Sequence, residues 1–411
     1  MNGKYCLIGE KLSHSYSAEI HRKNGLDYSL VELEPTAVER FMREGGYDGF
    51  NVTIPYKKAV IPYLDWISDE AREMGSVNTV KRVNGKNYGY NTDVIGMERA
   101  FYRAGVNLEN KRVIVLGSGG AGNTAAYLAR NKGARVSTVS RRGDINYDNC
   151  YEKFQDAEII INATPVGMYP DTARSPIDLS RFCKAEAVFD CIYNPFRTEL
   201  LLQAEKAGII PINGLSMLVE QALQAEKIWQ TGCLYGLDEI VGSIYREKTN
   251  LVLYGMPSCG KSTIGSLVAK ELNRPFVDTD KEITALFGVT PEEIIENEGE
   301  EEFRKKESIV INRVASEGGK VISVGGGAVI RETNVDALKK NGVLIYLQRD
   351  IKKLISDGRP ISRRKGIEEL FNERRPIYER IKEGVCSNDG DVDYCVKGVI
   401  KEYENTCDKR R

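Results

Sequence analysis

A nine-residue run beyond the middle of the chain combines glycines, a lysine and three hydroxyl side chains in an order suited to phosphate binding. Residues 255–263 read GMPSCGKST, which satisfies the GxxxxGK[ST] pattern. An apolar run, 251–254, precedes it and an amphipathic run, 264–272, follows, so the pattern predicts a strand, a glycine-rich loop and a helix. In this context backbone N–H groups surround the phosphates, Lys261 reaches the terminal phosphates and the Ser262 hydroxyl meets Mg²⁺. A glycine-rich turn without a ligand is the alternative.

A second glycine-rich run predicts a dinucleotide site. Residues 117–122 read GSGGAG, directly after the apolar segment 111–117 and before a helix expected at 124–131. The next expected strand, 135–139, ends in Ser140, Arg141 and Arg142. An enzyme specific for NAD usually has an acidic residue near this point, whereas two arginines suit the 2′-phosphate of NADP. A tight αβ turn and a solvated basic turn are the alternatives.

Polar side chains in the first hundred residues suggest a site for a small hydroxylated molecule. Ser15 and Ser17 stand at alternate positions of a segment expected to be extended, so their hydroxyls face one way. Lys57 follows a proline turn, and Asn78 and Asp93 come at the ends of apolar segments. Lys57 and Asp93 could form an acid–base pair for hydride chemistry on a carbon bearing a hydroxyl. A loop that caps the next helix and a surface salt bridge are the alternatives.

Acidic and basic residues after the phosphate loop predict phosphoryl transfer. Asp278 and Asp280 stand at i and i+2 of a strand expected at 276–280, hence on one face. One can serve Mg²⁺ through water while the other accepts a proton from a substrate hydroxyl. The expected strand 321–327 ends in three glycines, which permit close approach of a ligand. A basic loop at 357–366 has the look of a lid that covers phosphates.

Composition limits the remaining classes. The 411 residues suit two or three domains, and 41% apolar with 28% charged residues is typical of a soluble globular protein. A net charge of −1 argues against nucleic acid as a partner, and no apolar run is long enough for a membrane span. The nine scattered cysteines suit free thiols in a reducing cytoplasm. With two histidines, acid–base chemistry should rest on Lys, Asp, Glu or Tyr.

Strand-like and helix-like segments alternate throughout, which predicts an α/β fold. We expect a first domain at 1–102, onto which about 214–245 packs back through a helix at 215–229, and a second domain at 103–213. A short polar linker at 246–250 then leads to a third domain at 251–411.

The motifs before residue 245 resemble, in order and spacing, those of shikimate dehydrogenase. They are SHSYS, NVTIPYK, SVNT, YNTD, GSGGAGNT, NATPVGM, DCIYNP and GLSMLVEQ. The resemblance implies an α/β substrate domain and a Rossmann-type NADP domain, with Lys57 as acid–base catalyst and Asp93 beside it. Lys11 and Ala18 stand where the family usually has Pro. By this resemblance Ser15, Ser17, Thr53, Asn78, Asp93, Tyr193 and Gln221 line the shikimate site, and Gly117, Ser118, Gly119, Gly120, Ala121, Ser140, Arg141, Arg142, Cys191 and Gly214 line NADP(H).

The motifs GMPSCGKST, FVDTD, EEFRKKE, SVGGGAV, DGRPI and NERRPIY resemble shikimate kinase over about residues 250–403. This resemblance implies a P-loop kinase domain with a central parallel sheet. Ser258, Cys259, Gly260, Lys261, Ser262, Thr263 and the lid residue Arg359 would bind ATP, and Ser262 and Asp278 would serve Mg²⁺. Lys261, Asp280 and Arg359 would be catalytic, while Asp280, Arg304, Gly326 and Arg374 would hold shikimate.

Together the two resemblances imply a bifunctional enzyme that reduces 3-dehydroshikimate with NADPH and then phosphorylates shikimate with ATP. We expect a cytoplasmic protein with small-molecule substrates and allow for a homodimer. One alternative is a ligand-sensing regulator built from inactive domains, although Lys57, Asp93, Lys261 and Asp280 are all present. Another is a dehydrogenase that prefers quinate or NAD, fused to the kinase.

Overall fold

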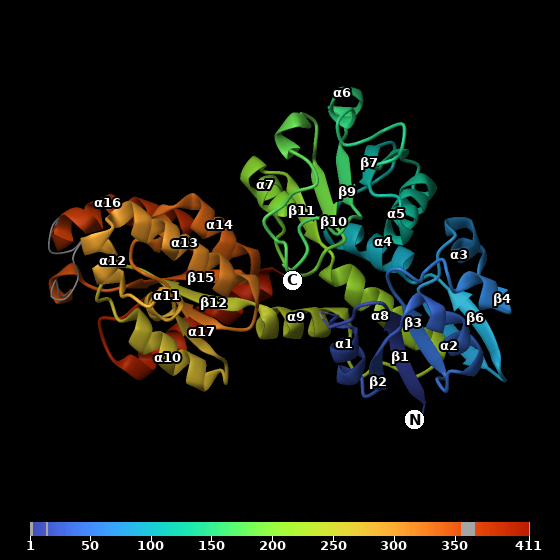
Figure 1. Ribbon diagram of the computed structural model, residues 1–411, viewed down its shortest axis with the longest axis horizontal. Helices are drawn as coiled ribbons and strands as arrows, with labels where there is room; N and C mark the ends of the chain where they lie inside the picture. Colours follow the sequence, from blue (N-terminus) through green and yellow to red (C-terminus); the bar gives the residue numbers. More distant parts are fainter. Residues whose placement is uncertain (1–2, 14, 355–365, 411) are drawn as a thin grey trace. The chain divides into compact units, whose positions relative to one another are not determined.

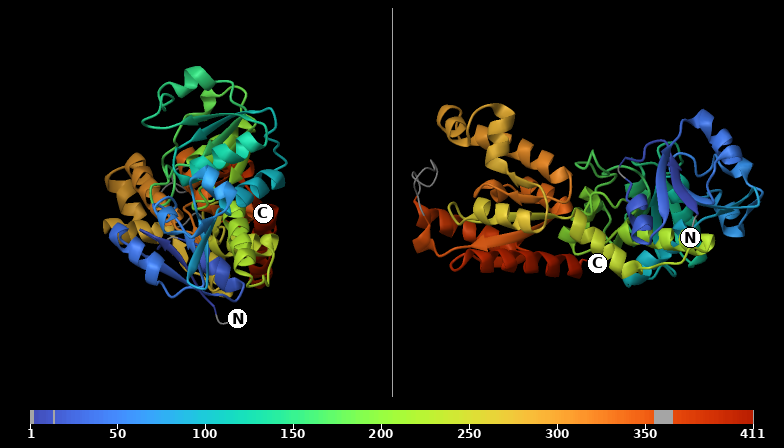
Figure 2. Two further views of the ribbon diagram at one scale, coloured as in Figure 1. Left: turned by 90° about the vertical axis from the view of Figure 1, so that its right-hand side faces the viewer. Right: turned by 90° about the horizontal axis from the view of Figure 1, so that it is seen from below.

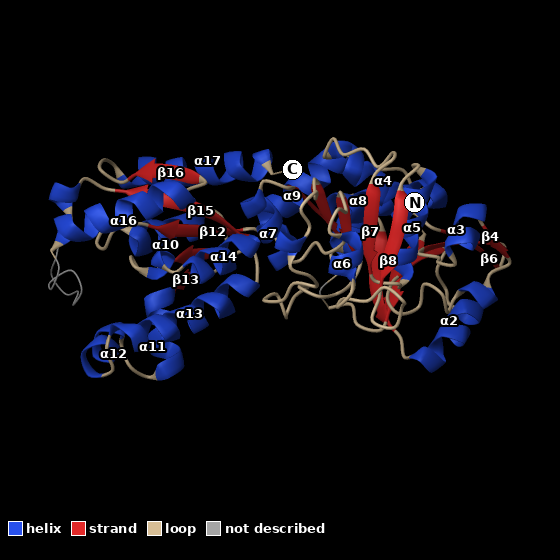
Figure 3. Ribbon diagram, turned by 90° about the horizontal axis from the view of Figure 1, so that it is seen from above, coloured by secondary structure: helices blue, strands red, loops and turns tan. Residues whose placement is uncertain are grey.

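The computed structural model describes residues 3–13, 15–354 and 366–410, and the chain forms two compact units, Met1–Val241 and Gly242–Arg411 (Figure 1). Both units are α/β, as predicted, and each sheet has helices beside it (Figure 3). No helix among the described residues is long and apolar enough to cross a membrane.

The first sheet of the first unit has six strands in the order β2-β1-β3-β5-β6-β4. β1 pairs in parallel with both β2 and β3, and β5 is antiparallel to its two neighbours. Cys6 and Ile8 of β1 point into one core and Tyr5 and Leu7 into another, so both faces of the sheet are covered. The elements are β1 (Lys4–Gly9), α1 (Ser17–Lys23), β2 (Asp27–Glu32), η1 (Pro35–Ala37), α2 (Val38–Glu44), β3 (Gly49–Val52), η2 (Ile61–Tyr63), β4 (Trp66–Ile67), α3 (Asp69–Met74), β5 (Thr79–Val83) and β6 (Lys86–Tyr90).

The second sheet has five parallel strands in the order β11-β10-β9-β7-β8. Alternate residues of β7 enter two separate cores: Val113 and Val115 enter one, and Ile114 and Leu116 the other. This alternation explains the continuous apolar run in the sequence. The elements are α4 (Asp93–Arg103), β7 (Arg112–Leu116), α5 (Gly120–Asn131), β8 (Arg135–Val139), α6 (Cys150–Phe154), β9 (Ile159–Asn162), η3 (Leu179–Arg181), β10 (Ala187–Asp190), α7 (Glu199–Ala207), β11 (Ile210–Asn213) and α8 (Leu215–Trp229).

Helix α8 returns to the first sheet, as the sequence predicts for 215–229. The Trp229 ring stacks on Tyr5 with centroids 4.9 Å apart, and its Nε1 donates to the carbonyl of Val80 at 3.0 Å. Gly49 on β3 leaves room for this indole, because a Cβ there would overlap the ring. The C-terminal end of α8 is therefore fixed against the strands that lead toward Lys57 and Asn78.

A buried ion pair fixes the same helix from a second side. His21 Nδ1 lies 2.7 Å from Glu226 Oε1, and neither side chain is exposed. His21 Nε2 lies 3.2 Å from Asn51 Oδ1, while the amide nitrogen of Asn51 donates to the carbonyl of Asn78 at 3.3 Å. Both imidazole nitrogens thus have a polar partner inside the protein. The pair joins α1, α8 and the end of β3 beside the first candidate site.

Helices α4 and α8 cross closely at a glycine. A Cβ on Gly96 would lie 2.5 Å from the carbonyl oxygen of Met217 and 3.3 Å from Cβ of Gln221. Asp93 is the first residue of α4, one turn before this crossing, and Gln221 is one turn after Met217 on α8. Gly96 therefore sets the separation of Asp93 and Gln221.

The substitution Gly96→Ala should lower both stability and dehydrogenase activity. Alanine normally stabilises a helix, but here overpacking should cost about 1–3 kcal/mol and push the two helices apart. We expect a lower melting temperature and roughly a tenfold loss of kcat/KM, because the site is displaced. Gly46→Ala is the control, since a Cβ there meets nothing within 4 Å. A more stable, fully active Gly96→Ala protein would contradict the role of this crossing.

The second unit contains one parallel sheet in the order β13-β14-β12-β15-β16, with a single large core. The long helix α17 contacts β15, β16 and α10, and is the red helix along the lower edge of this unit in the right-hand view of Figure 2. The elements are β12 (Asn250–Tyr254), α10 (Lys261–Glu271), β13 (Phe276–Asp278), α11 (Thr279–Phe287), α12 (Pro291–Asn297), α13 (Glu300–Ser316), β14 (Val321–Ser323), η4 (Ala328–Ile330), α14 (Glu332–Asn341), β15 (Gly342–Gln348), η5 (Ile351–Lys353), α16 (Ile367–Ile381), β16 (Gly384–Ser387) and α17 (Val392–Lys409).

The segment expected as a polar linker, 246–250, is structured. Helix α9 (Leu237–Lys248) runs through most of it, the buried Thr249 follows, and β12 begins at Asn250. The boundary between the two compact units falls earlier, after Val241 and inside this helix. The reason is an apolar stripe with helical spacing, which forms the first part of α9. The helix then continues into the polar residues that suggested a linker. The stripe consists of Leu237, Ile240, Val241, Ile244 and Tyr245.

Candidate active sites

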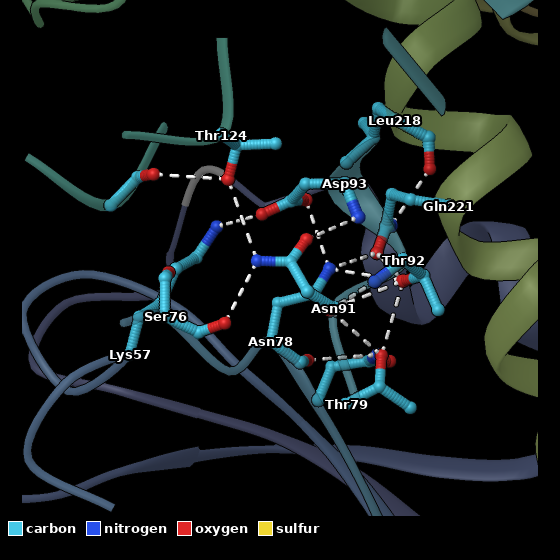
Figure 4. A network of polar contacts seen from close by, with 12 residues as sticks. Lys57, Ser76, Asn78, Thr79, Asn91, Thr92, Asp93, Thr124, Leu218 and Gln221 are labelled. Carbon is cyan, nitrogen blue, oxygen red and sulfur yellow. Dashed lines mark hydrogen bonds and ion pairs between the residues drawn. The ribbon is translucent and has the colours of Figure 1, made fainter. Parts of the chain in front are cut away.

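The first candidate site is centred on a close pair of opposite charges (Figure 4). Lys57 Nζ lies 2.6 Å from Asp93 Oδ2, and the side chains are 17% and 7% exposed, which excludes an ordinary surface salt bridge. The other oxygen of Asp93 accepts from Asn78 Nδ2 at 2.9 Å. Asn78 also donates to Gln221 Oε1 at 3.3 Å, and Gln221 donates to the carbonyl of Leu218 at 2.8 Å. The four predicted residues Lys57, Asn78, Asp93 and Gln221 therefore meet at one place.

Four elements bring these side chains together. Lys57 lies in the turn after β3, Asn78 immediately precedes β5, Asp93 starts α4, and Gln221 lies midway along α8. Each side chain is held by a hydrogen bond to another, so the ammonium of Lys57 has a fixed direction. An ammonium in this setting can give a proton to a substrate oxygen and take it back.

The glycine-rich run 117–122 lies directly beside this pair. A Cβ on Gly120 would lie 3.0 Å from Ser76 Oγ and 3.2 Å from Cδ of Lys57. Ser76 Oγ is buried and has no hydrogen-bond partner within residues 3–13, 15–354 and 366–410. Gly117 has φ +106°, and a Cβ on Gly122 would overlap the carbonyl of Gly117, so both glycines are required by the loop. The loop opens α5, whose free N–H groups and dipole suit a pyrophosphate.

The two arginines predicted to select NADP follow β8 and are exposed. A tight turn forms here, in which the Ser140 N–H donates to the carbonyl of Ile145 at 3.0 Å. Arg141 and Arg142 project from this turn at the carboxyl end of a strand next to the glycine loop. Among the predicted cofactor residues, Cys191 and Gly214 are also adjacent, because a Cβ on Gly214 would overlap the carbonyl of Cys191.

Ser15 and Ser17 lie together, but not in the extended segment that we expected. Ser17 is the first residue of α1, and the Ser15 and Ser17 hydroxyls are 3.1 Å apart. The expectation was wrong because the Ser15 hydroxyl accepts the Ser17 N–H and so starts the helix. Tyr193 joins this pair: burial raises the pKa of its phenol, and a hydrogen bond with Ser15 opposes that shift. Thr53, which follows β3, bonds through its N–H to the carbonyl of Ile8 at 2.9 Å.

The second candidate site begins at the phosphate loop. Lys261 is buried, and its Nζ donates to the carbonyls of Met256 at 2.9 Å and Gly255 at 3.1 Å. Gly260 has φ +97° and precedes the first turn of α10. Ser262 Oγ donates to Asp278 Oδ2 at 2.5 Å. The hydroxyl and the carboxylate predicted to serve Mg²⁺ are thus in direct contact, and their oxygens are the ligand type that this cation prefers.

The prediction that Asp278 and Asp280 share one face of a strand was wrong. β13 ends at Asp278, and α11 begins at Thr279. The physical reason is that Asp is a favoured N-cap: the Asp278 carboxylate accepts the N–H of Asp280 at 3.1 Å and so starts the helix. The two carboxylates consequently separate, one toward Ser262 and the other toward Gly325, where a Cβ would lie 3.1 Å from Asp280 Oδ1.

The glycine turn after β14 gathers the predicted substrate residues. A Cβ on Gly326 would lie 3.2 Å from Arg374 Nη1, and a Cβ on Gly327 would overlap the guanidinium of Arg304. Arg304 and Arg374 are 7% and 3% exposed. Asp280, Arg304, Gly326 and Arg374 therefore lie around one turn. Arg374 Nε is buried and has no hydrogen-bond partner among the described residues, as expected for a group that awaits a ligand. The predicted lid residue Arg359 lies outside the described residues.

One acidic residue of this site was missed from the sequence. Glu307 is fully buried, and its Oε2 accepts from Arg304 Nη1 at 2.8 Å, while its Oε1 has no hydrogen-bond partner in the described part of the chain. Burial raises the pKa of Glu307, Arg304 opposes the rise, and the nearby charge of Asp280 adds to it. The spacing i, i+3 within the charged run of α13 is the signal that could have identified it. Glu307 neutralises Arg304 and fixes its direction.

Comparison with known proteins places the chain among two families. The family model of the shikimate dehydrogenase substrate binding domain matches residues 7–80, and that of shikimate kinase matches residues 257–404. A shikimate dehydrogenase (NADP(+)) from Caldicellulosiruptor bescii is 39% identical, over 55% of this chain and 88% of that protein. One from Clostridium perfringens is also 39% identical, over 54% of this chain and 90% of that protein.

Solved structures extend the agreement to the fold. Shikimate dehydrogenase 1 from Peptoclostridium difficile has a TM-score of 0.54 and 34% identity, and covers 58% of this chain and 96% of its own. A chorismate mutase/shikimate 5-dehydrogenase fusion protein from Clostridium acetobutylicum has the same TM-score and the same coverage of both chains, with 36% identity. The chain therefore belongs to the shikimate dehydrogenase family and carries a shikimate kinase domain at residues 257–404.

Proposed function

We propose that this chain catalyses two consecutive steps: reduction of 3-dehydroshikimate to shikimate with NADPH, and transfer of the γ-phosphoryl group of ATP to shikimate. The observation that carries the first step is the buried Lys57–Asp93 pair, 2.6 Å apart and directly beside the glycine loop at Gly120. The shikimate kinase match at residues 257–404 and the contact between Ser262 and Asp278 support the second.

In the first reaction the ammonium of Lys57 gives its proton to the C3 carbonyl oxygen of the substrate, which becomes a hydroxyl. NADPH, when bound, supplies the hydride that C3 receives. Asp93 holds the Lys57 ammonium in a fixed direction before the transfer. Asn78 and Gln221, which are already linked by a hydrogen bond, orient the substrate hydroxyls.

In the second reaction the carboxylate of Asp280 accepts the proton of the substrate hydroxyl that attacks the phosphoryl group. Arg304 and Arg374 hold the substrate carboxylate, since two buried guanidinium groups at one turn suit an anion. Lys261 and the N–H groups of the phosphate loop hold the phosphates. Mg²⁺, when bound, would rest on the oxygens of Ser262 and Asp278 and supply charge neutralisation of the phosphates.

A coupled assay tests the whole proposal. Purified chain is given 3-dehydroshikimate, NADPH, ATP and Mg²⁺, and shikimate 3-phosphate is measured. A regulator built from inactive domains would bind these molecules without turnover. A dehydrogenase that prefers quinate or NAD would show higher kcat/KM with those compounds.

Arg141 and Arg142 should select NADPH over NADH. Replacement of both by Ala should raise KM for NADPH roughly tenfold, the value of one charge-assisted hydrogen bond at an exposed site, and leave KM for NADH nearly unchanged. The control is Arg135→Ala, an exposed arginine at the opposite end of the same strand. Equal changes for both cofactors would mean that these arginines are ordinary solvated charges.

A further inference from the structure

Two cysteines of the kinase half have their sulfur atoms in contact. Cys386 lies on β16 and Cys395 lies in the first turns of α17, and the Sγ atoms are 3.8 Å apart. Both thiols are free; Cys386 is half-buried, whereas Cys395 is only 1% exposed. The sulfur of Cys386 also packs against Gly398, where a Cβ would lie 3.0 Å from it, so strand and helix approach closely at this pair.

The surroundings of the pair make Cys386 the reactive thiol. A hydrogen bond between the two sulfur atoms lowers the pKa of Cys386. The same bond, together with burial, raises the pKa of Cys395. The thiolate is the form that attacks an oxidant, and Cys386 is also the more accessible of the two. Cys395 is then in position to attack the oxidised sulfur of Cys386 and form a disulfide.

The segment between the two cysteines supports the phosphate loop. Asn388 Nδ2 donates to the carbonyl of Cys259 at 2.8 Å, and the Asn388 N–H donates to the carbonyl of Gln348 at 2.8 Å. The carbonyl of Cys259 precedes Gly260 and Lys261 in the nucleotide-binding run. A change in the separation of β16 and α17 would therefore reach this run through the Asn388 side chain.

We propose that Cys386 and Cys395 form an oxidation-sensitive dithiol whose disulfide weakens nucleotide binding by the kinase half. With hydrogen peroxide, the Cys386 thiolate attacks one oxygen, the O–O bond breaks, and a sulfenic acid and hydroxide form; the hydroxide takes up a proton. The Cys395 sulfur then attacks the Cys386 sulfur. The hydroxide that leaves Cys386 takes the proton of the Cys395 thiol and departs as water. In sum two thiols and one peroxide give one disulfide and two waters. The sulfur atoms close from 3.8 Å to about 2.05 Å, which moves both ends of the segment that holds Asn388.

The test uses the full chain and its own dehydrogenase as an internal control. After brief treatment with hydrogen peroxide we expect the loss of two thiols, a disulfide-linked peptide pair containing Cys386 and Cys395, and a rise of about fivefold in the Kd for ATP, the value of one hydrogen bond. A thiol reductant should reverse all three, and the dehydrogenase rate should not change. The kinase rate rests on the proposed function, whereas thiol count, peptide mass and ATP titration do not.

Four variants make the outcome decisive. Cys386→Ser and Cys395→Ala should each keep their ATP affinity after peroxide, while Cys183→Ser, which removes an exposed cysteine of the other unit, should respond as the unmodified chain does. Asn388→Ala should weaken ATP binding without any oxidant. A disulfide at other positions, an unchanged Kd in the oxidised chain, or equal sensitivity of Cys386→Ser would each overturn the proposal.

Discussion

Lys57→Met should abolish reduction of 3-dehydroshikimate while leaving phosphorylation of shikimate near normal. The substitution removes the proton donor and keeps the length of the side chain, so the expected loss in kcat is about 10²–10⁴-fold. The buried Asp93 carboxylate keeps its hydrogen bond from Asn78, so the variant should still fold. The measurement is NADPH oxidation in the same preparation whose kinase rate is followed separately. A variant that keeps more than a third of kcat would rule out the acid–base role.

Lys57→Arg separates charge from proton transfer. Arginine can pair with Asp93 and hold the substrate oxygen, but it does not release its proton in the working pH range. We therefore expect KM to stay close to that of the unmodified chain, while kcat falls nearly as far as in Lys57→Met. A large rise in KM with little change in kcat would instead assign Lys57 to binding alone.

Patterns within short segments predicted much of this fold. The strand, glycine loop and helix around 117 and around 260 formed as expected, because each depends on neighbours in sequence: an apolar run, glycines and an amphipathic run. The convergence of Lys57, Asn78 and Asp93 could also be inferred, because polar residues at the ends of apolar segments tend to meet at one edge of a sheet.

Interactions across long sequence separations could not be predicted in this way. Glu226 lies 205 residues from His21, and no local pattern distinguishes it from the other glutamates of an amphipathic helix. Glu307 has a local signal, its i, i+3 spacing from Arg304, but its burial follows from the packing of α13 against the glycine turn. Asp278 shows a different limit of sequence-based prediction. An aspartate can be the last residue of a strand or the N-cap of a helix, and the sequence did not show where the strand ends.

Asp280→Asn should nearly eliminate phosphoryl transfer while ATP still binds. The structure assigns the two carboxylates to different neighbours: Asp278 contacts Ser262, whereas Asp280 lies over Gly325 among Glu307, Arg304 and Arg374. In the proposed mechanism, nucleotide affinity resides in Lys261 and the backbone of the phosphate loop, which the substitution does not touch. Asn keeps the shape but cannot accept the proton of the attacking hydroxyl. Since phosphoryl transfer depends on positioning, kcat should fall by roughly 10²-fold or more.

The matched control is Asp278→Asn, which alters the partner of Ser262 instead. That variant should raise the Mg²⁺ concentration needed for half-maximal rate, because a neutral amide is a weaker ligand for this cation than a carboxylate, and it should leave KM for shikimate nearly constant. Titration of ATP, titration of Mg²⁺ and both kcat values on each preparation distinguish the two positions, with the dehydrogenase rate as the internal standard. If Asp280→Asn loses ATP binding yet phosphorylates shikimate well at saturating ATP, the roles of the two carboxylates are reversed. Asp280, which lies beside Gly325, would then be the metal ligand.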